Sequence, residues 1–159
     1  DRFEELENEA YALGIQVVET EMTVPGMDAA FLNLSGEERI FLRHGGTSCE
    51  RACWVAEELG HHHTGQTQIL RYRCVEAWRA EARARRWAHK RLLSPDAIRT
   101  AAQNTDDIYE IAEALDVNVE FLQESIDDFQ SKGMWSLMTI KLSEVNKKPP
   151  GVASTEAAD

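Results

Sequence analysis

Two glutamates followed four residues later by two histidines restrict how the middle of this chain can fold. In the segment AEELGHH (residues 56–62), Glu57 precedes His61 and Glu58 precedes His62 by four positions. Residues i and i+4 lie on one face of an α-helix, one turn apart. Carboxylate and imidazole groups are both ordinary zinc ligands. The spacing predicts a helix with a metal-binding face, although charged helices without a metal also show it, and it does not choose between the two pairs.

The residues before this segment predict a helix and a small sheet. Apolar residues at 3, 6, 10 and 13 repeat at helical spacing, and Gly14 is a natural stop. Runs of β-branched and aromatic residues predict three strands, at 15–20, 29–34 and 39–43. The last two would form a hairpin through residues 35–38. Thr47-Ser48 with Glu50 behind them predicts the capped start of a helix at about 48–62.

The residues after the segment predict helices almost throughout. A long helix at 72–93 should end at Ser94-Pro95, since proline disfavours helix in the residue before it. Shorter helices follow at 95–103, 105–115 and 118–132, then a strand or extended arm at 134–142. We therefore expect a core of residues 1–94, a C-terminal helical region of the same compact unit at 95–142, and a disordered polar tail at 143–159.

The charges are unevenly distributed along the chain. The formal net charge is −11, yet residues 71–91 hold eight basic residues against two acidic ones, and 106–128 hold nine acidic residues and no basic one. The two segments could neutralise each other within one molecule or dock a charged partner. The acidic balance argues against direct nucleic-acid binding, and the helix pair at 106–131 lacks the positive charge that a DNA-reading helix needs.

Location and the remaining aromatic and cysteine residues give weaker expectations. No apolar run approaches the roughly 20 residues that span a bilayer, and no signal-peptide pattern opens the chain, so we expect a cytoplasmic protein with reduced cysteines. Cys53, one turn before Glu57, is expected to be a buried hydrophobe more often than a fourth ligand. Trp54, Trp78 and Trp87 are expected to pack in the core.

Two further stretches complete a pattern around AEELGH. Glu81 stands six residues before Trp87-Ala88, Leu92-Leu93 follow, and residues 111–122 read IAEALDVNVEFL. Together these resemble the ImmA/IrrE family of bacterial metallo-endopeptidases, in which a HELGH helix precedes a helix reading roughly ExxxxxFAxxLLxP. The resemblance covers residues 13–133, with Pro95 one position late. It implies an α+β, zincin-like fold with a small N-terminal antiparallel or mixed sheet, an active-site helix, a long second helix and a C-terminal helical bundle.

The resemblance also implies a site. Glu57, His61 and Glu81 would be the metal ligands and Glu58 the general base. Glu76 is the alternative third ligand, and His62 and His89 are possible accessory groups, the latter near an oxyanion. The family's usual first ligand is histidine, so Glu57 is a departure. A second carboxylate should make zinc a weaker Lewis acid and favour ions such as Mn²⁺, or mark a site without metal.

The implied activity is zinc-dependent cleavage of a regulatory protein. In this family the substrate is typically a DNA-binding repressor encoded by a phage or other mobile element. The alternative is a weak or inactive pseudo-peptidase that acts as a protein-binding module. The sequence leaves the oligomeric state open.

Overall fold

A computed structural model of the chain describes residues 1–65 and 75–133. The predicted arm at 134–142, the tail at 143–159 and the first residues of the predicted helix at 72–93 lie wholly or partly outside these ranges. The N-terminal helix α1 spans Arg2–Ala12, and the Asp1 side chain caps it by accepting the backbone N–H of Phe3 at 2.9 Å. The residue after its C-cap, Gly14, has φ 80°, which ends the helix at the predicted place.

Three short strands form a mixed sheet in the order β1-β3-β2. β1 (Gln16–Thr20) pairs in parallel with β3 (Glu37–Arg43), which pairs antiparallel with β2 (Ala29–Leu34). The hairpin is tighter than expected, because β3 begins at Glu37 and not at Arg39. Ser35 and Gly36 both have positive φ, 56° and 94°, as a two-residue type I′ turn requires. In the order β1-β3-β2, strand β2 lies at one edge of the sheet, where it contacts α2.

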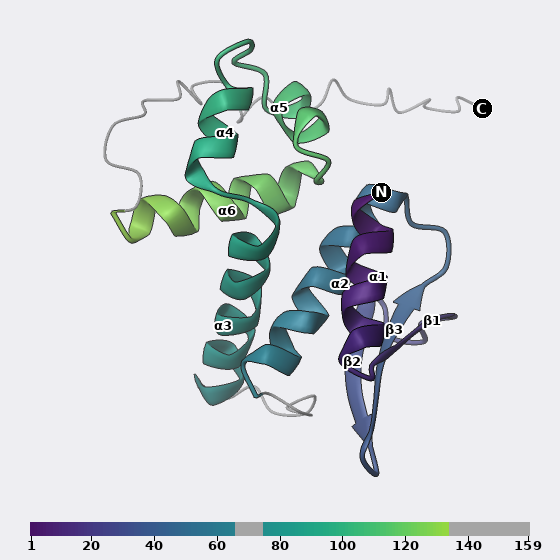
Figure 1. Cartoon of the computed structure of the whole chain (residues 1–159). Coiled ribbons are helices and arrows are strands. Elements are labelled where there is room, and N and C mark those ends of the chain that lie inside the picture. Colours follow the sequence, from purple (N-terminus) through teal and green to yellow (C-terminus); the bar gives the residue numbers. More distant parts are fainter. Residues whose placement is uncertain (66–74, 134–159) are drawn as a thin grey trace, which may run out of the picture.

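The helix α2 (Ser48–His63) is the central element of the molecule (Figure 1). The predicted capping box is present: Glu50 N–H donates to the Thr47 hydroxyl, and Thr47 N–H donates to the Glu50 carboxylate at 2.8 Å. On one side α2 contacts α1 and the sheet, and on the other it packs along α3 (Val75–Leu92). Gly60 makes this second contact possible, since a Cβ there would lie 2.8 Å from the carbonyl carbon of Ala84.

The described part of the chain ends in three helices, each of which begins at a polar N-cap. Ser94, Asp107 and Asn118 accept backbone N–H groups at the starts of α4 (Pro95–Ala101), α5 (Ile108–Ala114) and α6 (Val119–Ser131). Helix α6 packs against α3, where Arg85 pairs with Glu124 at 3.3 Å and Arg86 with Asp128 at 3.6 Å. Part of the basic and acidic segments thus neutralise each other within the molecule.

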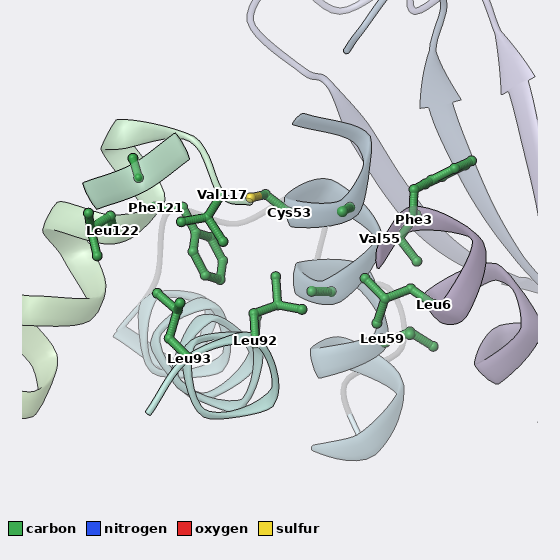
Figure 2. Close-up of a cluster of buried hydrophobic side chains, with 14 of the residues drawn as sticks. Phe3, Leu6, Cys53, Val55, Leu59, Leu92, Leu93, Val117, Phe121 and Leu122 are labelled. Carbon is green, nitrogen blue, oxygen red and sulfur yellow. The ribbon is translucent and has the colours of Figure 1, made fainter. Parts of the chain in front are cut away.

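One hydrophobic core joins these elements. It runs from α1 and the sheet through α2 to α3 and the C-terminal helices. Figure 2 shows Cys53 of α2 directed toward Val117, close to Phe121 of α6. The expected α+β class and arrangement are confirmed. The prediction for Trp78 was wrong, since its side chain is 75% exposed. Among the described helices, none combines the length and apolar character that crossing a bilayer requires.

Candidate active site

The three consecutive histidines at the end of α2 point to three different partners. His61 Nε2 lies 3.5 Å from Glu81 Oε2 of α3, while His62 Nδ1 lies 2.9 Å from Glu38 Oε2 of β3. The ring of His63 stacks on Trp87 with a centroid distance of 4.4 Å. Successive residues turn by about 100° around a helix, so neighbours cannot share one face. Only His61 faces the predicted ligand Glu81.

Glu58 is a partly buried carboxyl of α2 next to the edge strand β2. Burial raises its pKa to about 7, although the His61 charge and the backbone N–H of Phe31, which donates to the carboxylate, act in the opposite direction. A carboxyl with a pKa near neutrality can both accept and release a proton at physiological pH. The chemistry of Glu58 is compatible with the role of general base that the family resemblance implies for it.

Glu57 is the adjacent carboxyl, turned toward α3 and α6. Burial raises its pKa, opposed by the Arg85 charge and reinforced by the charges of Glu124 and Glu81. Among residues 1–65 and 75–133, nothing donates a hydrogen bond to it or forms an ion pair with it. A desolvated carboxylate without a partner is stabilised by any cation that reaches it.

His61 and Glu81 form a pair across the α2–α3 contact. Burial lowers the pKa of His61, but the hydrogen bond that His61 donates to Glu81 and the surrounding carboxylates outweigh burial and raise it. The same hydrogen bond lowers the pKa of Glu81, against the effect of its partial burial. Because the Glu81 side chain is 61% exposed, solvent weakens this pair. The pair does, however, place an imidazole and a carboxylate, two types of metal ligand, next to each other.

A cavity of about 450 Å³ opens beside Glu57 and Glu58. Its walls come from the loop before β2, from α2, from Arg85 of α3 and from the first turns of α6. Trp54 and Phe121 supply aromatic surface, and most of the remaining lining is polar or charged. The cavity is large enough for side chains of a peptide, so the two glutamates lie where a substrate could reach them.

The predicted ligands fit a divalent cation by chemistry. Glu57 is a partly buried carboxylate without an ion-pair partner in residues 1–65 and 75–133, and His61 and Glu81 are already in contact. In the described ranges, however, no three His, Cys, Asp or Glu side chains stand close enough together to hold a metal ion. His61 and Glu81 are in contact, and the charges of both act on Glu57.

The remaining predicted site residues lie elsewhere. Glu76 is exposed in the first turn of α3 and forms no ion pair with any described residue. The carboxylate that lies next to His61 is that of Glu81. His62 is held by Glu38 and lies edge-on against Phe31. Burial raises the pKa of Cys53 to about 12, which keeps it a thiol, whereas a metal ligand is a thiolate.

His89 lies in a second cavity, of about 360 Å³, between α3 and α6. Its side chain is 3% exposed, and neither ring nitrogen has a hydrogen-bond partner among the described residues. The ring contacts Phe121 edge-on. It does not line the cavity that holds Glu57 and Glu58, so the structure does not bring it to the predicted base.

The protonation of His89 should make the fold sensitive to acid. Burial lowers its pKa from 6.5 to about 4, Asp128 opposes this, and Arg85 and Lys132 add to it. The unfolded chain binds this proton below pH 6.5 and the folded chain only below about 4. The neutral form of His89 therefore costs the fold nothing above pH 6.5. Between pH 6.5 and 4 the free energy of unfolding should fall by roughly 3 kcal/mol.

Urea unfolding at pH 7.5, 5.5 and 4.5 measures this loss, with His89→Leu as the variant and His44→Leu as the exposed-histidine control. We expect the wild-type and His44→Leu proteins to lose more stability on acidification than His89→Leu. Parallel losses in all three would show that His89 is not the group responsible.

Several residues of the site were not found from the sequence. Arg85 and Glu124 line both cavities and pair across them, and the loop 24–28 forms one wall of the first. One signal existed for Arg85, since it lies one helical turn after Glu81 and so shares its face. For Glu124 and the loop, the sequence holds no local pattern that would have placed them there.

The family comparison agrees with this geometry. A family model described as the IrrE N-terminal-like domain (Peptidase_M78) matches residues 10–127. The chain belongs to this family. The IrrE N-terminal-like domain here extends from the end of α1 to most of α6 and includes both glutamates, His61 and Glu81, which confirms the family inferred from the sequence. Comparison with curated proteins and with solved structures gives no match. Membership supports a metallopeptidase-family role.

Proposed function

We propose that this IrrE N-terminal-like domain is a metal-dependent endopeptidase that cleaves a regulatory protein. The observation that carries the proposal is the position of Glu58, a partly buried carboxyl with a pKa of about 7 in the wall of a cavity of about 450 Å³. Glu57 lines the same cavity, and the His61–Glu81 pair lies one helical turn further along α2. This is the residue set of a hydrolytic site next to a space for substrate.

The proposed roles follow from these positions. Glu57, His61 and Glu81 would hold the metal, which when bound would polarise the scissile carbonyl and acidify water. Glu58 accepts a proton from the attacking water and returns it to the leaving amine nitrogen. The Phe31 N–H fixes the orientation of the Glu58 carboxylate, so the base does not need to reorganise during the reaction.

The ligand set affects which metal is expected. Two carboxylates and one imidazole carry more negative charge than two imidazoles and one carboxylate. Oxygen ligands favour harder ions, so zinc is the first candidate and Mn²⁺ the second. The extra charge also lowers the Lewis acidity of the ion, which predicts slower turnover than a site with two histidines.

A metal-binding measurement distinguishes the proposed ligands from neighbouring residues that are not ligands. We expect the purified chain to bind about one Zn²⁺, and Glu57→Gln, His61→Ala and Glu81→Gln each to weaken binding by at least about 10-fold, since each removes a direct ligand. Equilibrium dialysis with metal analysis measures this. Glu76→Gln and His62→Ala are the matched controls and should retain the ion. Loss in His62→Ala with retention in His61→Ala would assign the ion to Glu58 and His62.

The substrate that we propose is a DNA-binding repressor encoded by a phage or other mobile element, met in the cytoplasm. Family membership supports this class, and co-incubation with a regulator encoded beside the gene, followed by mass spectrometry, tests it. The alternative is a pseudo-peptidase that binds such a protein without cleaving it. The observation behind this alternative is that no three potential metal ligands stand together in the described part of the chain. Absence of zinc binding, together with a complex that stays intact, would support it.

A further inference from the structure

We propose that the cavity beside Glu57 and Glu58 is a specificity pocket for a lysine or arginine side chain of the substrate. This inference rests on the proposed function, since it assumes that a peptide enters the cavity. It adds the chemical class of residue that is recognised and assigns Glu120 and Glu124 of α6 as the residues that select it.

The charge of the cavity wall gives the first argument. Five carboxylates face one guanidinium, that of Arg85, in the lining: Asp28, Glu57, Glu58, Glu120 and Glu124. Asp28 is neutralised by Arg43 at 2.8 Å, and Arg85 pairs with Glu124. A divalent ion held through Glu57 would offset the charges near Glu58 as well. Glu120, an exposed carboxylate, has no cationic partner among the described residues, so the cavity favours a cation even with metal bound.

The pairing of the two α6 carboxylates gives the second argument. Glu120, in the first turn of α6, forms no ion pair and accepts no hydrogen bond from the described residues. Glu124 has Arg85 Nε at 3.3 Å and accepts no hydrogen bond in the same ranges. Two carboxylates one helical turn apart thus have unused acceptor capacity at the rim, and a guanidinium or ammonium group would fill it.

A second cavity lies on the other side of Glu124. The second cavity shares Arg85 and Glu124 with the first, and in it His89 Nε2 lies 4.0 Å from Glu124 Oε2. Both ring nitrogens of this buried histidine lack a hydrogen-bond partner in the described part of the chain. A neutral imidazole has one acceptor nitrogen, and buried polar atoms without partners are costly. His89 lines the second cavity and not the proposed pocket, so it bears on the pocket only through its contact with Glu124.

The apolar part of the wall fits the rest of such a side chain. Trp54 and Phe121 line the cavity between the glutamates of α2 and those of α6. Lysine and arginine carry a long aliphatic stem that packs on apolar surface while the charged end stays with polar partners. A shorter neutral side chain would use the aromatic surface and leave Glu120 without a partner. An acidic side chain would be repelled.

The test compares capped alanine heptapeptides whose central residue is arginine, lysine, citrulline or glutamate. Citrulline keeps the shape of arginine and most of its donors but lacks the charge. Calorimetric titration into the full zinc-loaded chain carrying Glu58→Gln measures binding without turnover. We expect arginine and lysine peptides to bind about 10-fold tighter than the citrulline peptide, and the glutamate peptide to bind weakest.

Glu120→Gln, added to the same chain, should reduce the preference for arginine over citrulline to about threefold or less, and leave citrulline binding unchanged. Glu110→Gln on α5 makes the same charge change away from the cavity and should leave the preference intact. Equal binding of arginine and citrulline, no binding of any peptide, or a preference unaffected by Glu120→Gln would each overturn the proposal. The arginine–citrulline comparison needs no substitution in α6, so a folding defect there cannot hide the result.

The outcome is separable from that of the proposed function. Preference for arginine in this titration, combined with no cleavage by the wild-type chain, would keep the pocket and reject the peptidase. Cleavage by the wild-type chain without preference for a basic residue would keep the peptidase and reject the pocket.

Discussion

Glu58→Gln is expected to reduce cleavage of a protein substrate by about 100-fold to 10,000-fold, the usual contribution of a general base. Glutamine keeps the size of the side chain and can still contact the Phe31 N–H through its carbonyl oxygen, but it cannot accept the proton of the attacking water. Glu58 is not one of the proposed metal ligands, so zinc content should stay near that of the wild-type chain. The loss should therefore appear in kcat at constant metal content.

The measurement needs three values for each protein: the initial rate of cleavage, the zinc per chain and the thermal midpoint. Glu76→Gln is the matched control, because it neutralises an exposed carboxylate of α3 outside both cavities. The control should cleave at the wild-type rate. If Glu58→Gln retained both its metal and its activity, the proton acceptor would have to be another group, and the role given to Glu58 would be rejected.

Most of the fold was predictable because local patterns encode it. Thr47 and Glu50 specify the start of α2 through a capping box, and Pro95 with Ser94 specifies the break between α3 and α4. The start of β3 was missed because the choice between a two-residue and a four-residue turn depends on positive φ at Ser35, a residue that rarely adopts it. Trp78 was misplaced because helical spacing alone does not say what covers a face.

From helical spacing, only the part of the candidate site that lies on a single helix could be predicted. The spacing of Glu57 and His61 follows from helix geometry, and Glu81 came from the family resemblance. The spacing did not choose between His61 and His62, and the choice of His61 also came from the family resemblance. In the structure α2 is rotated so that His61 lies beside Glu81 of α3 and His62 beside Glu38 of β3. Arg85 and Glu124 come together only when α6 docks on α3, a contact between residues 39 positions apart. No periodicity records such a contact.

Gly60→Ala should be among the most destabilising single substitutions in the molecule. A Cβ at this position would lie 3.0 Å from Ala84 Cα, 2.8 Å from its carbonyl carbon and closer still to its oxygen. These are backbone atoms in the middle of a helix, so no side-chain rotation relieves the clash and α2 and α3 must separate. We expect a net loss of about 3 kcal/mol, even though alanine gains about 1 kcal/mol of helix propensity over glycine.

Gly46→Ala is the informative comparison, because there the added Cβ meets the ring of Trp54 at 2.5 Å, and a side chain can move where a backbone cannot. We expect its loss to stay at about 1 kcal/mol. Thermal and urea unfolding measure both variants, and the Gly60→Ala midpoint should fall by roughly 10 °C. Separation of α2 from α3 also moves Glu81 away from His61, so zinc binding should weaken in Gly60→Ala and persist in Gly46→Ala. Wild-type stability in Gly60→Ala would show that the two helices do not cross this closely, and the placement of Glu81 beside His61 would fall with it.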